Sequence, residues 1–374
     1  MSMFDDEESL MLDAVAEFTD QEVAPLVLDR LENDEFPQEI LDRMAELGLF
    51  TLSLPEEYGG LGKGVVLSTA IESRIAQESL AVAFACGAGS LVQKAIIEKG
   101  TDQQKQDLLP LILNKPCAFA LTEPEAGSDV SAITTTAVRE GDGWAINGQK
   151  TFISFSAQAD HFAVGCKTHE TGNGGITMIL VPRDTPGFSV GEPFHKLGFH
   201  GSGTAELFFD NVRVPYGNVI GTENKGMHLA LSILDEARVG VAAYAVGMCD
   251  RAISTAATYI KQRIAFGKPL STKQGLQWYF AEMDARTEAA RALMYRAAAN
   301  FDEGLPVSID AARAKLVATE AAKFVTDKAV QICGGMGLMR DFGLERLYRD
   351  AKVLNIIEGT DEIQKMVIAR SVLQ

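Results

Sequence analysis

The hydrophobic pattern of the first 115 residues has the period of α-helices. Apolar side chains share one face of residues 9–22, Pro37 is placed to open a second helix, and Gly48 is placed to end it. After a turn-rich loop, three more helices are expected, over residues 65–79, 81–98 and 102–113. Residues 1–115 are therefore predicted to form an N-terminal α-helical domain.

The pattern changes at Pro116, where short β-rich runs separated by turns replace the helical period. Residues 139–154 contain a Gly-Asp-Gly and an Asn-Gly turn signal between such runs. Further apolar runs begin at positions 161, 176, 188 and 205. Several short strands at this spacing predict that residues 116–224 form a small β-barrel or sandwich.

Helical periodicity returns after Asn224 and continues to the end of the chain. Four long alanine-rich stretches are joined by short breaks that contain Gly or Pro, over residues 225–262, 275–303, 307–333 and 343–373. Such helices are typical of an antiparallel bundle. The expected fold class is therefore α+β and mainly α, with a helical domain, a middle β domain and a C-terminal four-helix bundle over residues 225–374.

The composition is that of a globular protein from a reducing compartment. Of the 374 residues, 47% are hydrophobic and 23% are charged. The net charge of −17 argues against nucleic acid or anionic lipid as a partner. The acidic N-terminus lacks the features of a signal peptide, and the apolar run 81–92 is too short for a membrane span. The five cysteines show no metal-ligand spacing, so we expect reduced thiols, no metal and a cytoplasmic protein.

One carboxylate near the C-terminus lies in an unusual setting. Ile356 and Ile357 precede Glu358, Gly359 follows it, and a new helix is expected to begin at Thr360. Apolar neighbours raise the pKa of a carboxylate, whereas the positive end of a helix stabilises its anion. Glu358 is therefore a candidate general base. The alternative, from this segment alone, is a solvated charge at a helix end.

Two segments could hold the edge of a planar ligand. The loop of residues 119–129 offers hydroxyls and free backbone donors around a Gly-Ser turn. Residues 152–154 place an aromatic ring beside a hydroxyl at the end of an expected strand. An ordinary structured loop and a packed strand end are the alternative interpretations.

Three further features could contact a charged ligand. Arg263 closes a long helix and could clamp a diphosphate, or it could be a cation at a helix C-terminus. The glycine-rich break at 331–337 allows close approach of backbone to a ligand, but it is also a plain helix stop. Asp235 and Arg238 lie three apart on one helix, where they could pair with each other or grip a polar ligand.

In their order and spacing, eight segments resemble motifs of the acyl-CoA dehydrogenase family of flavoproteins, over essentially the whole chain. They are PEEYGG (55–60), ALTEPEAGSDV (120–130), INGQKTFIS (146–154), LDEAR (234–238), QRIAFGKPL (262–270), QICGGMG (331–337), YRDAK (348–352) and IIEGTDEIQ (356–364). The segment from Gln331 onward is most similar to short- and medium-chain members. The resemblance implies FAD as cofactor, an acyl-CoA substrate, electron-transfer flavoprotein as partner, and a homotetramer built as a dimer of dimers.

The resemblance also implies roles for single residues. Flavin contacts within one subunit match Phe119, Leu121, Thr122, Gly127, Ser128, Phe152, Ile153, Ser154, Thr360 and Glu362. FAD contacts that come across a subunit interface match Arg263, Phe266, Gln274, Gln331, Ile332, Gly334 and Gly335. Substrate-binding positions match Ser128, Thr168, Asp235, Arg238, Ile357 and Gly359.

Glu358 matches the family's catalytic base. The resemblance implies that Glu358 removes the α-proton of the thioester while the β-hydrogen leaves as hydride to flavin N5, which gives a trans-2-enoyl-CoA. The Glu358 backbone N–H and a flavin ribityl hydroxyl would polarise the thioester carbonyl. Some members instead place the base immediately before the arginine of LDEAR, a position that Ala237 occupies here. Glu236 lies about 100° further around the helix, so it does not replace Glu358.

Three positions depart from the family pattern and leave the acyl group undefined. Ile357 replaces the tyrosine that usually precedes the base, Glu125 stands where glycine is common, and Phe152 replaces a common tryptophan. Short- or medium-chain acyl groups, whether straight, branched or cyclic, all remain open. Residues 84–92 contain no arginine, the residue with which glutaryl-type members hold a distal carboxylate, and this argues against a dicarboxylic substrate.

Other functions are compatible with the same segments. The site could run in reverse as an enoyl-CoA reductase, or react with oxygen as an oxidase. A non-catalytic scaffold with the family fold is an alternative of a different class. The retained Glu358, Arg263 and glycine-rich stretch argue against that scaffold.

Overall fold

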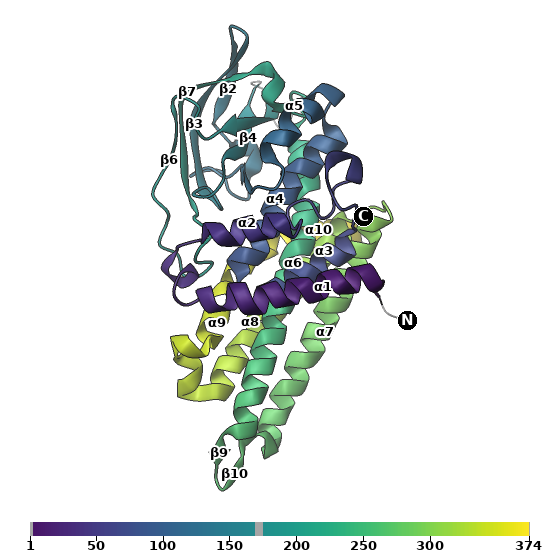
Figure 1. Cartoon of the computed structure of the whole chain (residues 1–374), viewed down its shortest axis with the longest axis vertical. Helices are drawn as coiled ribbons and strands as arrows, with labels where there is room; N and C mark the ends of the chain where they lie inside the picture. Colours follow the sequence, from purple (N-terminus) through teal and green to yellow (C-terminus); the bar gives the residue numbers. More distant parts are fainter. Residues whose placement is uncertain (1–2, 169–174, 374) are drawn as a thin grey trace.

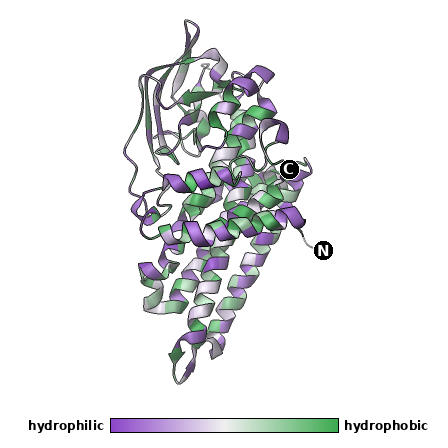
Figure 2. Ribbon diagram, viewed as in Figure 1, coloured by the Kyte–Doolittle hydropathy of each residue, from purple (hydrophilic) through white to green (hydrophobic). Residues whose placement is uncertain are grey.

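The computed structural model describes residues 3–168 and 175–373, and it confirms the expected order of helices, strands and helices (Figure 1). The N-terminal part comprises five α-helices: α1 (Asp6–Phe18), α2 (Gln38–Glu46), α3 (Val65–Ala76), α4 (Leu80–Lys99) and α5 (Asp102–Ile112). Helices α1 and α2 carry both hydrophilic and hydrophobic positions, as surface helices do (Figure 2).

The start of α1 is set by a capping box. The Asp5 carboxylate accepts from the Glu8 N–H, and the Glu8 side chain accepts from the Asp5 N–H. The helix therefore begins at Asp6, three residues before the expected start at Ser9. It ends at Phe18 and continues as a π-helical turn over Thr19–Val23 that leads to Pro25.

Helix α4 is longer than expected. Its 20 residues are apolar enough on average to cross a membrane by length and composition, although Lys94 interrupts the apolar run that begins at Leu80. Within the described residues it is the one helix that meets this test, and 61% of its most apolar window is buried. Val92 and Ile96 pack with Met178 and Leu180 of the sheet. The helix therefore belongs to the protein core.

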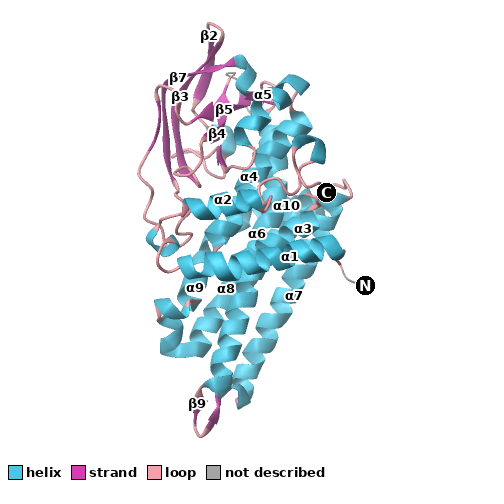
Figure 3. Cartoon of the chain, viewed as in Figure 1, coloured by secondary structure: helices cyan, strands magenta, loops and turns pink. Residues whose placement is uncertain are grey.

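The middle part is one sheet whose strands gather at one end of the molecule (Figure 3). Its order is β6-β7-β3-β2-β4-β5-β8, and β1 also pairs with β4. The strands are β1 (Cys117–Ala120), β2 (Thr136–Glu140), β3 (Gly143–Ile153), β4 (His161–Lys167), β5 (Ile176–Pro182), β6 (Phe188–Val190), β7 (Ala205–Pro215) and β8 (Val219–Ile220). Strand β1 is parallel to β4, with Cys117 opposite His161, and this pairing brings the loop after β1 beside the end of β3.

The C-terminal part is built on three long helices packed through small side chains. These are α6 (Gly226–Gln262), α7 (Gln274–Asp302) and α8 (Ser308–Cys333), followed by α9 (Leu344–Leu354) and α10 (Asp361–Leu373). Buried alanines line α6 and α8 and allow their backbones to approach closely. The expected last stretch, 343–373, is two helices, because residues 355–360 form a turn. A short hairpin, β9 (Ile264–Ala265) and β10 (Lys268–Pro269), caps the end of the bundle far from the sheet (Figure 1).

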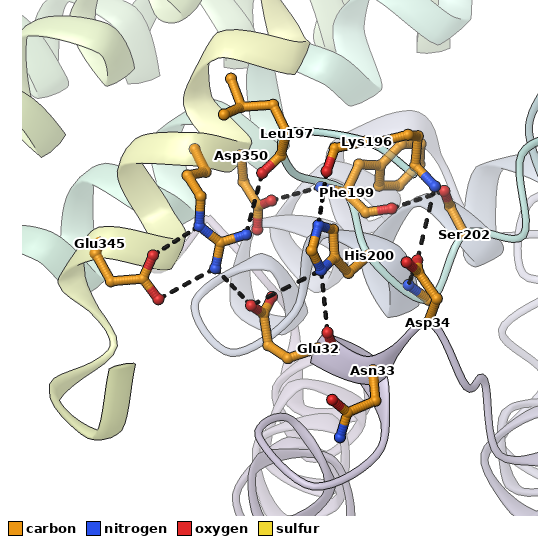
Figure 4. A network of polar contacts seen from close by, with 12 residues as sticks. Glu32, Asn33, Asp34, Lys196, Leu197, Phe199, His200, Ser202, Glu345 and Asp350 are labelled. Carbon is orange, nitrogen blue, oxygen red and sulfur yellow. Dashed lines mark hydrogen bonds and ion pairs between the residues drawn. The ribbon is translucent and has the colours of Figure 1, made fainter. Parts of the chain in front are cut away.

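A polar network ties all three parts together (Figure 4). Arg349 of α9 donates to Glu32 of the N-terminal part, to Glu345, and to the Leu197 carbonyl in the loop before β7. Asp350 accepts from the Phe199 N–H at 2.6 Å. Because Arg349 is bound from three directions, it fixes the orientation of α9 against the other two parts.

We expect Arg349→Ala to lower the free energy of unfolding by about 3 kcal/mol, because it leaves Glu32 without its cation in a nearly buried site. Urea denaturation measures this. Arg313→Ala is the matched control, since the Arg313 side chain is more exposed and Asp310 keeps Arg296 as its cation, and it should cost less than about 1 kcal/mol. Equal losses in the two variants would contradict a special role for the network.

Candidate active site

A cavity of about 510 Å³ opens where the sheet meets the two helical parts. Its walls come from β1 and the loop after it, the end of β3, α4, α6 and the turn between α9 and α10. This volume is typical of a site for a small organic ligand. The structure thus brings together many residues predicted from separate segments: Phe119, Leu121, Thr122, Gly127, Ser128, Phe152, Ile153, Ser154, Arg238, Ile357, Glu358, Gly359 and Thr360.

The turn that carries Glu358 has a strained backbone. Glu358 has φ 52° and Gly359 has φ 87°, so two successive residues adopt the left-handed conformation. Lys315 of α8 donates to the Gly359 carbonyl at 2.6 Å, and Gln364 of α10 donates to the same oxygen at 2.8 Å. A non-glycine residue held in this conformation by surrounding contacts is typical of functional sites.

The ends of the turn are anchored by buried polar contacts. Asn355 donates to the Asp361 carboxylate at 2.6 Å, and Thr319 donates to its other oxygen at 3.0 Å. Thr360, rather than Glu358, accepts from the first turn of α10, through the Ile363 N–H. Glu358 is therefore not used to cap this helix.

The Glu358 carboxylate is half-buried and lines the cavity. Among the residues that the structure describes, its side chain has no hydrogen-bond partner. Burial raises its pKa above the usual value, while the positive charges of Lys315 and Arg238 act in the opposite direction. This setting differs from the solvated helix-end charge that the segment alone left open.

The loop after β1 is pinned by a buried ion pair. The Lys150 ammonium of β3, which is fully buried, donates to Glu123 at 2.7 Å and to the Leu121 carbonyl at 3.1 Å. Glu123 also accepts from the backbone of Thr134 and Thr135. Burial alone would raise the pKa of Glu123, but Lys150 and these donors outweigh it and lower the pKa to about 2.

Sequence reasoning missed Lys150, Glu123 and Lys315 as supports of the site. The only signal for Lys150 was a charged residue within an otherwise strand-forming run, and a lysine in a strand is more often exposed. Lys315 lies on an alanine-rich helix and has no motif around it. Only the packing of α8 against the turn shows what Lys315 contacts.

Ten predicted site residues do not line this cavity: Arg263, Phe266, Gln274, Gln331, Ile332, Gly334, Gly335, Glu362, Asp235 and Thr168. The first three lie at the β9–β10 end of the bundle, remote from the cavity (Figure 1). Phe266 is 94% exposed and has φ 52°. Residues 331–335 end α8 and begin a 3-10 turn.

The last three of those ten residues have other surroundings. Asp235 accepts from Arg238 at 2.6 Å and so orients the guanidinium, which does line the cavity. Thr168 bonds to Asn224 and Thr177, each at 2.7 Å. Glu362 is exposed on α10.

Three family models match successive parts of the chain. They describe the N-terminal domain (residues 5–115), the middle domain (residues 118–212) and the C-terminal domain (residues 224–373) of acyl-CoA dehydrogenase. Among curated proteins, acryloyl-CoA reductase (NADH) of Anaerotignum propionicum is 41% identical over 98% of this chain and 95% of its own. A short-chain-specific acyl-CoA dehydrogenase of Clostridium acetobutylicum is also 41% identical, over 98% of each chain.

Solved structures agree with these matches. Butyryl-CoA dehydrogenase from Megasphaera elsdenii superposes with a TM-score of 0.97 at 38% identity, over the full length of both chains. A chain from a structure of the electron transferring flavoprotein of Acidaminococcus fermentans gives the same TM-score at 37% identity, again over both full lengths. The protein belongs to the acyl-CoA dehydrogenase family. It is an FAD-dependent oxidoreductase that acts on the CH–CH bond of an acyl-CoA.

The cavity residues fit the flavin of FAD. Phe152 is 65% exposed, has φ 56°, and offers its ring at the cavity wall. Hydroxyls of Thr122, Ser128 and Ser154 line the same space. Nothing lies within 4 Å of a Cβ placed on Gly127, so a ligand can approach the backbone there.

We expect Lys150→Met to lower the free energy of unfolding by about 3–5 kcal/mol near neutral pH, because it leaves the Glu123 charge buried and unpaired. The difference from the parent should shrink as the pH falls from about 4.5 toward about 2, where Glu123 in the parent is protonated. Adding Glu123→Gln to Lys150→Met should recover part of the loss. Urea denaturation across pH tests this, and a pH-independent difference would contradict it.

Proposed function

We propose that this protein catalyses the α,β-dehydrogenation of a short- or medium-chain acyl-CoA to the trans-2-enoyl-CoA, with Glu358 as the base. One observation carries the proposal: a half-buried carboxylate without a partner lines the cavity from a strained turn. Its raised pKa suits a group that must remove a proton from carbon near neutral pH.

The same turn supplies a donor for the thioester carbonyl. Among the described residues the Glu358 backbone N–H has no acceptor, although its neighbours Ile356 and Ile357 both donate to Val353. A free N–H fixed beside the base stabilises the oxyanion that develops as the α-proton leaves. Ile357 and Gly359 then line the acyl pocket beside it, and Arg238 contributes a positive field.

FAD, when bound, supplies the acceptor for the hydride that leaves the β-carbon. Phe119, Leu121, Thr122 and Ser128 on the loop after β1, with Phe152 to Ser154, would hold the ring system. We assign Arg263, Phe266, Gln274 and residues 331–335 to the FAD of a neighbouring subunit, because they lie too far along the bundle to serve their own cavity. Exposed apolar side chains beside them, Ile264 and Trp278 among them, support burial in a homodimer, two of which would form the tetramer.

The direction of the reaction depends on the electron partner. One relative is described as a dehydrogenase and another as an NADH-dependent acryloyl-CoA reductase, so enoyl-CoA reduction at the same site is the second candidate. Electron-transfer flavoprotein is the proposed partner, because a chain that matches this one occurs in a solved structure of such a flavoprotein.

The five cysteines are buried and free, which supports the cytoplasm as the location. We retain 1–115, 116–224 and 225–374 as the domain bounds.

Glu358→Gln should retain FAD and lose at least a thousandfold in the rate at which acyl-CoA bleaches the visible flavin absorption under anaerobic conditions. The amide keeps the shape of the side chain but cannot accept the α-proton. Glu320→Gln, on the exposed face of α8, is the control and should bleach at the parental rate. Rapid bleaching by Glu358→Gln would refute the role of Glu358.

Lys315→Met should raise the pKa of Glu358 further, because the Lys315 charge lowers it in the parent. The acid limb of the bleaching rate should therefore move to higher pH. Lys323→Met, at an exposed position of the same helix, should leave the profile in place. A shift to lower pH in Lys315→Met would show that Lys315 does not stabilise the Glu358 anion.

A further inference from the structure

A second, smaller cavity of about 30 Å³ adjoins the main one, between α3, α4 and α6. The two cavities share Phe84, Ala88, Leu91 and Glu358 as walls, so the small one extends the space beside the base. Six oxygen-bearing side chains that do not line the main cavity surround it: Ser68, Thr69, Glu72, Ser90, Glu236 and Tyr244. We call this space the distal chamber.

Two buried oxygen groups converge in the distal chamber without a partner. Glu72 is 8% exposed and Tyr244 is 3% exposed, and neither side chain has a hydrogen bond within residues 3–168 and 175–373. A Cβ placed on Gly240 would meet Glu72 Oε2 at 3.1 Å and the Tyr244 hydroxyl at 3.3 Å. A Cβ on Gly87 would meet the same hydroxyl at 3.0 Å and Glu72 Oε1 at 3.7 Å. Both groups therefore point to one spot between the two glycines.

The charge balance of the distal chamber favours an uncharged guest. No cation is among the residues that line the chamber, and the Glu236 carboxylate is already paired with Lys94. Burial, and then the charge of Glu236, raises the pKa of Glu72 to about 8, and burial raises that of Tyr244 well above its usual value. Near neutral pH, both groups are mainly protonated and can each donate and accept a hydrogen bond.

We propose that the distal chamber binds the end of the acyl chain and selects short acyl groups that end in a hydroxyl, through Glu72 and Tyr244. This inference rests on the proposed function and names its substrate class. A terminal methyl group would leave two buried polar groups unsatisfied, which is costly. A carboxylate would lie beside the Glu236 carboxylate in a chamber that no cation lines, and an ammonium group would lose its hydration shell to two uncharged partners. A hydroxyl replaces the one or two waters that a space of this size holds.

The test compares straight-chain acyl-CoAs from butyryl to octanoyl, each with a plain, an ω-hydroxyl, an ω-amino and an ω-carboxyl end. Anaerobic flavin bleaching gives kcat/KM, and titration calorimetry gives the dissociation constant. At the one chain length that reaches Glu72, we expect the hydroxylated member to be preferred by about tenfold or more in both measurements. No preference at any length, or a preference for ω-amino or ω-carboxyl chains, would overturn the proposal.

Substitutions test whether Glu72 and Tyr244 cause the preference for the hydroxylated acyl-CoA. Tyr244→Phe and Glu72→Leu should each reduce it to about twofold or less, whereas Glu72→Gln should keep it, because an amide resembles the protonated acid. Gly87→Ala should narrow the chamber and weaken binding of the hydroxylated member most. Flavin content and thermal unfolding check that each variant is folded, and Glu72→Gln, the nearly isosteric change, keeps the test informative if Glu72→Leu does not fold. A preference that survives both Tyr244→Phe and Glu72→Leu would place recognition elsewhere and overturn the assignment.

The acyl-CoA panel also distinguishes failure of the hydroxyl-binding role from failure of the proposed dehydrogenase function. If none of the acyl-CoAs bleaches the flavin and the matching enoyl-CoAs do not reoxidise it, the proposed function fails. If plain acyl-CoAs bleach as well as hydroxylated ones at every length, the proposed function stands and the hydroxyl-binding role of Glu72 and Tyr244 fails.

Discussion

The turn between α9 and α10 depends on contacts from a helix that is distant in sequence. Two successive left-handed residues, Glu358 and Gly359, are unfavourable in an isolated chain, by about 1–3 kcal/mol for the non-glycine residue. Lys315 and Thr319 on α8 bond to Gly359 and Asp361, at the C-terminal end of the turn. The position of the Glu358 carboxylate is thus decided by how closely α8 packs on α6 and α10. The close packing of α8 on α6 is possible because many of the buried side chains of these two helices are alanine.

The other side of the cavity depends on a second buried charge. Lys150 bonds to Glu123 and to the Leu121 carbonyl, and this fixes the position of the loop after β1 relative to β3. Both halves of the site therefore use a buried lysine that donates to backbone carbonyl oxygen. The buried ammonium groups of the two lysines favour one geometry strongly, because any other arrangement would leave a charge unpaired in a medium of low polarity. The space left between the two halves is the cavity.

Much of this architecture could be predicted from the sequence, because it depends on local patterns. The change of period at Pro116 and again after Asn224 predicted the order of the three parts, and the structure confirms it. The segment around Glu358 was recognisable as a break before a helix. Three details were harder to predict: α1 begins early because of its capping box, α4 is longer than its most apolar run, and residues 343–373 divide into two helices. Each of these depends on a capping contact or on burial by partners distant in sequence.

The candidate site was predictable in part only. Motifs identified Glu358, Arg238 and the loop after β1 as residues of one family site, and the structure places them around one cavity. They could not show that Arg263 and Phe266 lie at the opposite end of the bundle, because order along a chain does not specify distance in a folded one. Glu72 and Tyr244 carried no signal at all: one lies on an apolar helix and the other in a run of small residues.

The order of the helical and β parts, the family resemblance and the choice of Glu358 as the candidate base could all be inferred before the fold was known. These follow from periodicity and from short motifs, which are local properties. The packing of the folded chain was needed to show which polar groups are buried without partners, how the Glu358 turn is held, and that a polar chamber extends the space beside it. Burial and electrostatics arise when helices from different parts of the chain pack together, so no single segment contains that information.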